Sequence, residues 1–132
     1  MPKEGDLDAV LETRRIQILA DGTCDAMTLV FFETARGEEK ISAEWMDRQL
    51  RKINGVLKAL DELVRNVYGR GESFLVGGEF GVADIAVGSM LGMMEMVERE
   101  YGIVRWSEKF PELRRYWEGL GGEIVFLGKG LG

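Results

Sequence analysis

The fold of this chain is decided by one stretch, Phe74-Leu75-Val76-Gly77-Gly78-Glu79-Phe80-Gly81-Val82-Ala83-Asp84-Ile85-Ala86-Val87-Gly88. It starts as an extended apolar segment, turns at a glycine pair and then begins a helix whose third residue is an acid. With Gly81 at the N-cap, the Asp84 carboxylate can accept hydrogen bonds from free N–H groups of the first turn. We therefore expect Gly81 and Asp84 to cap a helix structurally, and we assign Asp84 no catalytic role.

The residues after this cap predict a helix over about 82–101 that is buried on most sides. Apolar or small residues recur there with near-helical spacing: Val82, Ile85, Ala86, Ser89, Met90, Met93, Met94 and Val97. The methionines of this segment are thioether groups that could bind a soft metal ion. Their spacing favours flexible core side chains instead, so we expect no metal site.

Three further helices are indicated. The first covers about 8–36, and Asp21-Gly22 leaves open a kink or a break within it. The second covers about 42–68, with Ser42 as its start, and the last begins near Pro111, which suits a first helical turn. The segment from 121 to 132 is rich in glycine around a short β-prone run, and we expect an extended tail there. The predicted architecture is an all-α bundle of about five helices over residues 1–120, followed by that tail over 121–132.

Composition excludes several classes of function. The chain has 132 residues, 30% of them charged, and a formal charge of −6, which argues against a sequence-independent grip on nucleic acid. It contains no histidine, which excludes Ser-His-Asp catalysis and His-ligated zinc within the chain. Cys24 is the single cysteine, and we interpret it as an inert, half-buried thiol. No apolar run approaches a membrane span or a signal peptide, so we expect a cytoplasmic protein without membrane contact.

The pattern as a whole resembles the C-terminal, all-helical domain of cytosolic glutathione transferases. The capped-helix stretch carries most of the resemblance, although the family usually has Ser or Thr where this chain has Gly81. The other matching positions, in chain order, are Arg15, Gln17, Ala20-Asp21-Gly22, Glu33, Arg36, Trp45, Gln49, Lys52, Ile53, Leu57, Trp106, Phe110-Pro111, Leu113 and Tyr116.

The resemblance covers only one half of that family's architecture. Glutathione transferases place a thioredoxin-like domain ahead of the helical one, and that domain carries most of the glutathione site and the catalytic residue. Here the match begins almost at Met1, so we name no catalytic residue and no cofactor beyond glutathione as a co-substrate. The leading interpretation is an interaction or scaffold module that cannot run the transferase reaction alone.

Two alternatives stay open. The chain could form the C-terminal half of a glutathione S-transferase that conjugates glutathione to electrophiles, or it could bind apolar ligands passively. Partners consistent with these hypotheses are a second copy in a homodimer, a thioredoxin-like domain or other protein, glutathione, or an apolar small molecule.

The resemblance also implies one binding residue. In several classes of the family, an acid on the first helix of this domain reaches across the dimer toward the amino group of glutathione. That acid stands three residues after a glycine, and Asp21-Gly22-Thr23-Cys24-Asp25 matches the pattern. Asp25 is therefore the candidate glutathione-binding residue, although a solvated acid on a helix face would look the same in the sequence.

Overall fold

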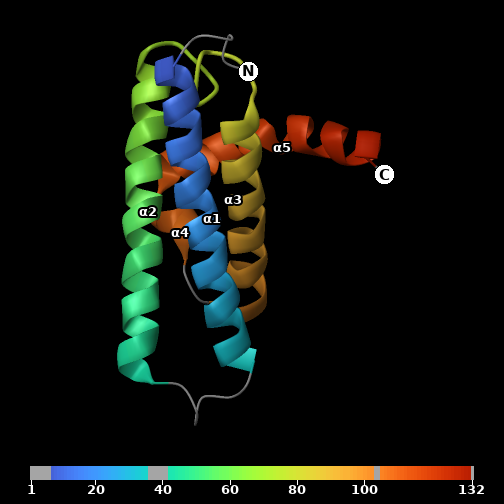
Figure 1. Cartoon of the computed structure of the whole chain (residues 1–132). Coiled ribbons are helices and arrows are strands. Elements are labelled where there is room, and N and C mark those ends of the chain that lie inside the picture. Colours follow the sequence, from blue (N-terminus) through green and yellow to red (C-terminus); the bar gives the residue numbers. More distant parts are fainter. Residues whose placement is uncertain (1–6, 36–41, 103–104, 132) are drawn as a thin grey trace.

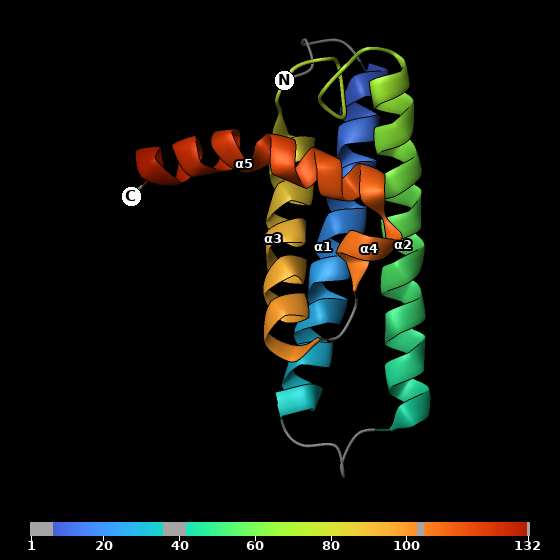
Figure 2. The same cartoon turned by 180° about the vertical axis from the view of Figure 1, so that it is seen from behind.

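The computed structural model describes residues 7–35, 42–102 and 105–131, with side chains over 7–34, 42–102 and 105–121. Five helices follow one another in these ranges: α1 (Leu7–Ala35), α2 (Ala43–Gly69), α3 (Val82–Tyr101), α4 (Trp106–Lys109) and α5 (Pro111–Leu131). Figure 1 shows α1 to α3 side by side as a long bundle, and Figure 2 shows α4 and α5 lying across it. No strand occurs within the described ranges, and the prediction of an all-α bundle is confirmed.

α2 forms where its amphipathic pattern predicts it. The Ser42 side chain accepts a hydrogen bond from the Trp45 N–H at 3.2 Å, which satisfies one of the free donors of the first turn. Gly71, just beyond the C-terminal end, has a φ of +79°, a left-handed conformation that glycine adopts without strain. The buried side of α2 is formed by Ile53, Leu57, Leu60, Val64 and Val67.

α1 is one continuous helix, and Gly22 does not break it. A helical glycine costs about 1 kcal/mol relative to alanine. The residues on either side offset that cost, because Ala20, Thr23 and Met27 are all buried against the bundle. The expected end of this helix, at Arg36, lies outside the described residues.

The buried face of α3 differs from the predicted one. Ile85 is 41% exposed and Ser89 is also exposed, although both were assigned to the core. The buried residues are Ala83, Asp84, Val87, Gly88, Met90, Leu91, Met94 and Val97. Apolar or small residues occupy almost every position of this helix up to Val97, so spacing alone could not decide which of two adjacent positions faces inward. Met90 and Met94 are core side chains with no exposed surface, whereas Met96 is 39% exposed.

α5 continues to Leu131, so the expectation of an extended segment after Leu120 is wrong. A helix that has already formed adds a hydrogen bond with each residue, whereas a β-prone run needs a partner strand. The far part of α5 projects beyond the bundle (Figure 1, red). The proposed domain boundary between residues 120 and 121 stays a prediction.

The near part of α5 is fixed to the bundle by apolar contacts and by a buried acid of α2. Leu113, Tyr116 and Leu120 join the core together with Trp106 of α4. The Asp61 carboxylate of α2 accepts the Leu113 N–H at 3.0 Å, so a side chain from a distant helix caps the first turn of α5. This contact sets the position at which α5 crosses the bundle.

Candidate functional site

Asp84 lies where three parts of the chain meet, and it has no exposed surface. Its carboxylate accepts the Gly81 N–H at 3.0 Å and the Leu75 N–H at 3.1 Å. It also accepts the Tyr116 hydroxyl of α5 at 2.6 Å. Gly81 is the N-cap residue of α3, with extended backbone angles and no side chain to accept a hydrogen bond. Asp84 therefore connects the start of α3, the apolar segment before it and α5.

The chemistry around Asp84 is that of a structural group. Burial and the adjacent Asp84 carboxylate both raise the pKa of Tyr116 above its usual value, which keeps the phenol protonated as a donor. A carboxylate with three donors and no exposed surface has no direction from which a substrate could approach. Asp84 thus holds the helix junction and offers no acid–base site.

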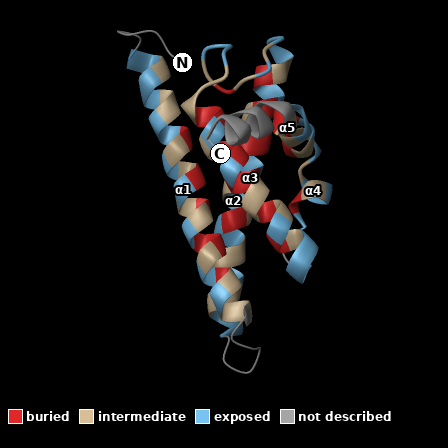
Figure 3. Ribbon diagram, turned by 90° about the vertical axis from the view of Figure 1, so that its right-hand side faces the viewer, coloured by how far each residue is buried: buried red, intermediate tan, exposed pale blue. Residues whose placement is uncertain are grey.

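Asp25, unlike the buried Asp84, lies on the surface of the domain. It is exposed in the middle of α1, and none of the described residues forms an ion pair or hydrogen bond with its side chain. Figure 3 shows the buried residues of α1 turned toward the bundle, with its other side exposed or half-buried. A carboxylate placed there is accessible to a ligand or a partner.

The exposed face around Asp25 is unusually apolar. We call it the α1 face, and its apolar members and their exposed fractions are Leu7 66%, Leu11 57%, Ile18 63%, Leu29 50% and Phe32 58%. The spacings of four, seven and three residues place these side chains and Asp25 on one side of the helix. Large exposed apolar side chains gathered on one side of a helix are a feature of interaction sites.

An apolar pocket opens at one end of the α1 face. It has a volume of about 180 Å³ between α1 and α3, and its lining includes Phe31, Phe32, Met93 and Met96. The Phe31 ring also packs edge-to-face on Tyr101, with 5.3 Å between ring centroids. Thr28, the one hydroxyl in the lining, donates to the Cys24 carbonyl at 2.9 Å, so the pocket presents almost no polar group.

Cys24 is a half-buried thiol in the interior of α1. Burial raises its pKa, and the neighbouring Asp21 and Asp25 charges raise it further. Each of these effects disfavours the thiolate, which is the nucleophilic form of cysteine. Because α1 is unbroken, no helix N-terminus is present there to lower the pKa.

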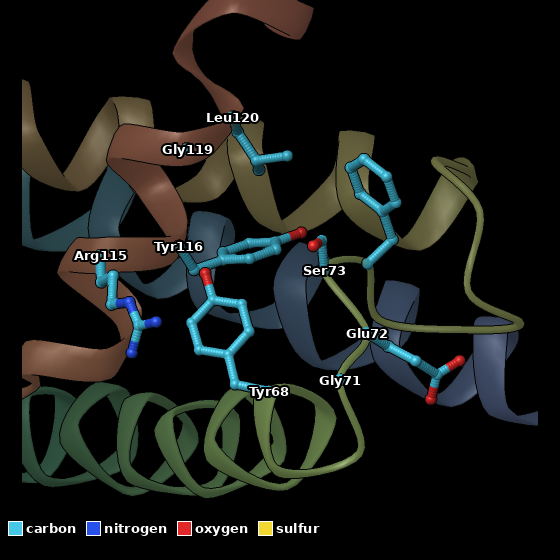
Figure 4. A pocket seen from close by; sticks show the side chains of 9 residues that line it. Tyr68, Gly71, Glu72, Ser73, Arg115, Tyr116, Gly119 and Leu120 are labelled. Carbon is cyan, nitrogen blue, oxygen red and sulfur yellow. The ribbon is translucent and has the colours of Figure 1, made fainter.

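A second, larger pocket lies between the end of α2 and α5 (Figure 4). Its volume is about 490 Å³, and aromatic side chains, an arginine and a glutamate contribute to its walls. No part of the sequence pattern predicted it, because it combines a helix end, the 71–74 segment and a helix that starts forty residues later.

Other polar contacts were also missed by sequence reasoning. Trp117 donates its indole N–H to Glu95 at 2.7 Å, and Arg114 donates to the same carboxylate at 2.9 Å. Together with the contacts of Asp61 and Tyr116, these interactions join α5 to α2 and α3. The only available signal was the occurrence of acids at otherwise core-facing positions.

The part of the chain that the structure describes shows neither a metal-binding cluster nor a membrane-spanning helix. Within it, no group of three or more acids, cysteines or histidines is arranged to hold a metal ion. No helix in the same ranges is long and apolar enough to cross a membrane.

Comparisons with known proteins identify the domain family to which this fold is similar. The family model for the glutathione S-transferase C-terminal domain matches residues 23–121. A glutathione S-transferase from Methylobacterium radiotolerans JCM 2831, solved with glutathione sulfonate, matches with 36% identity and a TM-score of 0.73. One from Methylobacillus flagellatus KT, solved with glutathione bound, matches with 30% identity and a TM-score of 0.73. No curated protein matches the chain.

The molecule is therefore an all-helical domain of the glutathione-transferase type. The matched segment covers most of the chain, which thus belongs to the glutathione S-transferase C-terminal domain family. The alignments cover 88% of this chain but only 51% and 54% of the two solved transferases. The chain spans about half the length of these structures.

Proposed function

We propose that this domain works by docking, through the α1 face, onto a thioredoxin-like domain, and that it does not catalyse glutathione transfer alone. The observation that carries the proposal is the apolar α1 face, on which five large side chains are each at least half exposed. Burying such side chains contributes about 1.5 kcal/mol or more each, so this face gains from a partner.

The choice of partner follows from the extent of the family match. The two solved transferases are about twice as long as the matched region, and one contains glutathione. In the glutathione transferase family, the half of the protein that this chain does not match is a thioredoxin-like domain, which carries most of the glutathione site. The proposal therefore assigns the α1 face to such a domain, either elsewhere in the same protein or in a separate chain.

Asp25 gives this docking a role in ligand binding. It sits among the apolar residues of the α1 face and is accessible. In the assembled protein, its carboxylate would form a charge-assisted hydrogen bond with the ammonium group of glutathione held by the thioredoxin-like half. Under this proposal the complete assembly is a glutathione S-transferase acting on electrophiles, and this domain supplies Asp25.

The apolar pocket supports a second candidate function, the binding of apolar ligands. Its lining of aromatic and methionine side chains has almost no polar surface. At about 180 Å³ it is smaller than most drug-sized sites, so it would hold a small ring or the end of an acyl chain. Such a ligand would lie beside Phe32, at one end of the α1 face.

Docking is tested by mixing this chain with the part of the M. radiotolerans transferase that the alignment leaves uncovered. We expect a 1:1 complex by size-exclusion chromatography with light scattering. Ile18→Lys places a charge within the α1 face and should weaken the complex at least about tenfold. Ile85→Lys, at an exposed apolar residue of α3, is the matched control and should leave the complex unchanged.

Two results would contradict docking through the α1 face. One is the absence of any complex with the wild-type chain, and the other is an equal effect of Ile18→Lys and Ile85→Lys. A homodimer that Ile18→Lys dissociates would instead assign the α1 face to a second copy of this chain.

A further inference from the structure

The pocket between α2 and α5 has the features of a ligand site and lies apart from the α1 face. Tyr68 comes from the end of α2, Phe74 from the segment that follows, and Arg115, Tyr116 and Gly119 from α5. We call it the Tyr68 pocket. No residue of α1 contributes to its lining, so a ligand there would be independent of the proposed docking.

The aromatic walls of the Tyr68 pocket are fixed before any ligand arrives. The Tyr116 ring is held by the hydrogen bond from its hydroxyl to Asp84. The Phe74 ring packs edge-to-face on Phe80 at 5.7 Å between centroids. The Arg115 guanidinium lies over the Tyr68 ring, 4.6 Å from the ring centroid. Preorganised rings favour a flat ligand, because little side-chain entropy is lost on binding.

The lining contains two charged residues, Glu72 and Arg115, and of these Glu72 has the closer partner of opposite charge. The Glu72 carboxylate accepts the Arg70 Nε–H at 2.7 Å. In Figure 4 the Glu72 carboxylate points away from the Tyr68 and Tyr116 rings. Apart from its contact with the Tyr68 ring, Arg115 has a long contact of 3.6 Å with the Glu112 carboxylate, and its side chain is 68% exposed. The charge available to a ligand at this pocket is therefore positive.

Tyr68 adds a neutral donor beside that positive charge. Burial is the main cause that raises the pKa of Tyr68, and Arg115 only partly opposes it. The phenol therefore keeps its proton at neutral pH and can donate to an anion. The Ser73 hydroxyl in the same lining is a further donor.

We propose that the Tyr68 pocket binds a small aromatic carboxylate, with its ring among Tyr68, Phe74 and Tyr116 and its carboxylate on Arg115. A planar guanidinium matches a carboxylate with two parallel hydrogen bonds. The pocket volume of about 490 Å³ is within the range of small-molecule sites and accommodates one or two fused rings.

The probe for this site is 2-naphthoate, and its uncharged counterpart is 2-naphthamide. Titration calorimetry of the whole chain should show saturable binding of 2-naphthoate, with the amide at least about tenfold weaker because it lacks the charge for Arg115. Equal affinity for the two compounds would overturn the proposal, as would no saturable binding of 2-naphthoate at millimolar concentration.

Two pairs of variants locate the binding. Arg115→Gln should weaken 2-naphthoate about tenfold, whereas Arg51→Gln, at an arginine of α2 that is 73% exposed, should not change it. Gly119→Leu should fill the pocket and abolish binding. Gly55→Leu is its control, because an added Cβ meets nothing within 4 Å at either helical glycine.

These variants also separate the Tyr68 pocket from the apolar pocket beside α1. Binding of 2-naphthoate that survives both Arg115→Gln and Gly119→Leu would place it elsewhere and contradict the assignment. Unchanged melting temperatures of the two variants would show that any lost binding is not caused by unfolding.

Discussion

Two aspartates of this chain lie in regions with opposite properties. Asp84 has no exposed surface and accepts three hydrogen bonds from three segments of the chain. Asp25 is exposed on α1, and no described residue pairs with its side chain. The region around Asp84 is complete within this domain, whereas the α1 face around Asp25 presents apolar groups without a partner among the described residues.

The comparison distinguishes a buried carboxylate that stabilises the fold, Asp84, from an exposed carboxylate that is accessible to a ligand, Asp25. A buried carboxylate with several donors is costly to disturb, because each donor left without an acceptor pays its full desolvation penalty. An exposed carboxylate contributes little to folding and can be used for binding at little cost to stability. The following variants test this division, from the largest expected effect to the smallest.

Asp84→Ala should destabilise the domain most. It leaves the Gly81 and Leu75 N–H groups and the Tyr116 hydroxyl without their acceptor, at about 1 kcal/mol or more each. We expect a loss of at least about 3 kcal/mol in the free energy of unfolding, measured by urea denaturation followed through tryptophan fluorescence. If the variant does not fold, Asp84→Asn provides a milder change. A loss of less than about 1 kcal/mol would contradict the structural role of Asp84.

Tyr116→Phe should have the next largest effect. It removes one of the three donors to Asp84 and keeps the ring in the core, so we expect a loss of about 1.5–3 kcal/mol. Tyr68→Phe is the control, since no described group is hydrogen-bonded to that half-buried hydroxyl. Equal stabilities of the two variants in the same urea experiment would show that the Tyr116 hydroxyl is not needed at the junction.

Glu95→Gln should have a smaller effect that depends on pH. The hydrogen bond from Arg114, and after it the one from Trp117, lowers the pKa of Glu95 below its usual value of 4.5. The pair therefore stabilises the folded state above the unfolded pKa, and this contribution is lost as pH falls through the folded pKa. At pH 7 we expect a loss of about 0.5–1 kcal/mol, reduced by solvent screening.

The pH dependence of that difference provides the measurement. Urea denaturation at a series of pH values should show wild type and Glu95→Gln converging in stability below about pH 4. Glu62→Gln, at an exposed glutamate of α2, is the control and should follow the wild type at every pH. A constant difference between wild type and Glu95→Gln down to pH 3 would contradict the role of the Glu95 charge.

Asp25→Ala should have the smallest effect on folding. An exposed side chain without a partner among the described residues is expected to change stability by no more than about 0.5 kcal/mol. Thermal melting followed by circular dichroism measures this. A melting temperature clearly below that of the wild type would give Asp25 a structural role and end its assignment as a binding residue.

The sequence predicted the parts of this fold that local chemistry controls. The bounds of α3, the Ser42 cap of α2 and the start of α5 at Pro111 follow from capping residues, glycines and proline, which act over a few positions. The buried face of α3 was predicted wrongly at Ile85 and Ser89, because a nearly uniform apolar pattern has no clear period. The length of α5 was missed for a similar reason, since the β-prone run after Gly122 carries only a weak local preference.

Contacts between distant segments were beyond such reasoning. The hydrogen bonds from Tyr116 to Asp84 and from Leu113 to Asp61 join residues 32 and 52 positions apart. The Tyr68 pocket likewise depends on how α5 crosses α2. Asp25 could be singled out only through resemblance to a family, because an exposed acid on a helix has no distinctive local pattern.

The division between the two aspartates is tested most directly by titrating reduced glutathione into the chain alone and into its mixture with the uncovered part of the M. radiotolerans transferase. We predict no saturable heat with the chain alone. We predict saturable binding in the mixture, weakened about tenfold by Asp25→Asn, which removes the charge and keeps the shape. Saturable binding by the chain alone, or binding in the mixture that Asp25→Asn leaves unchanged, would contradict the role of Asp25 as a glutathione-binding residue that acts only in the docked assembly.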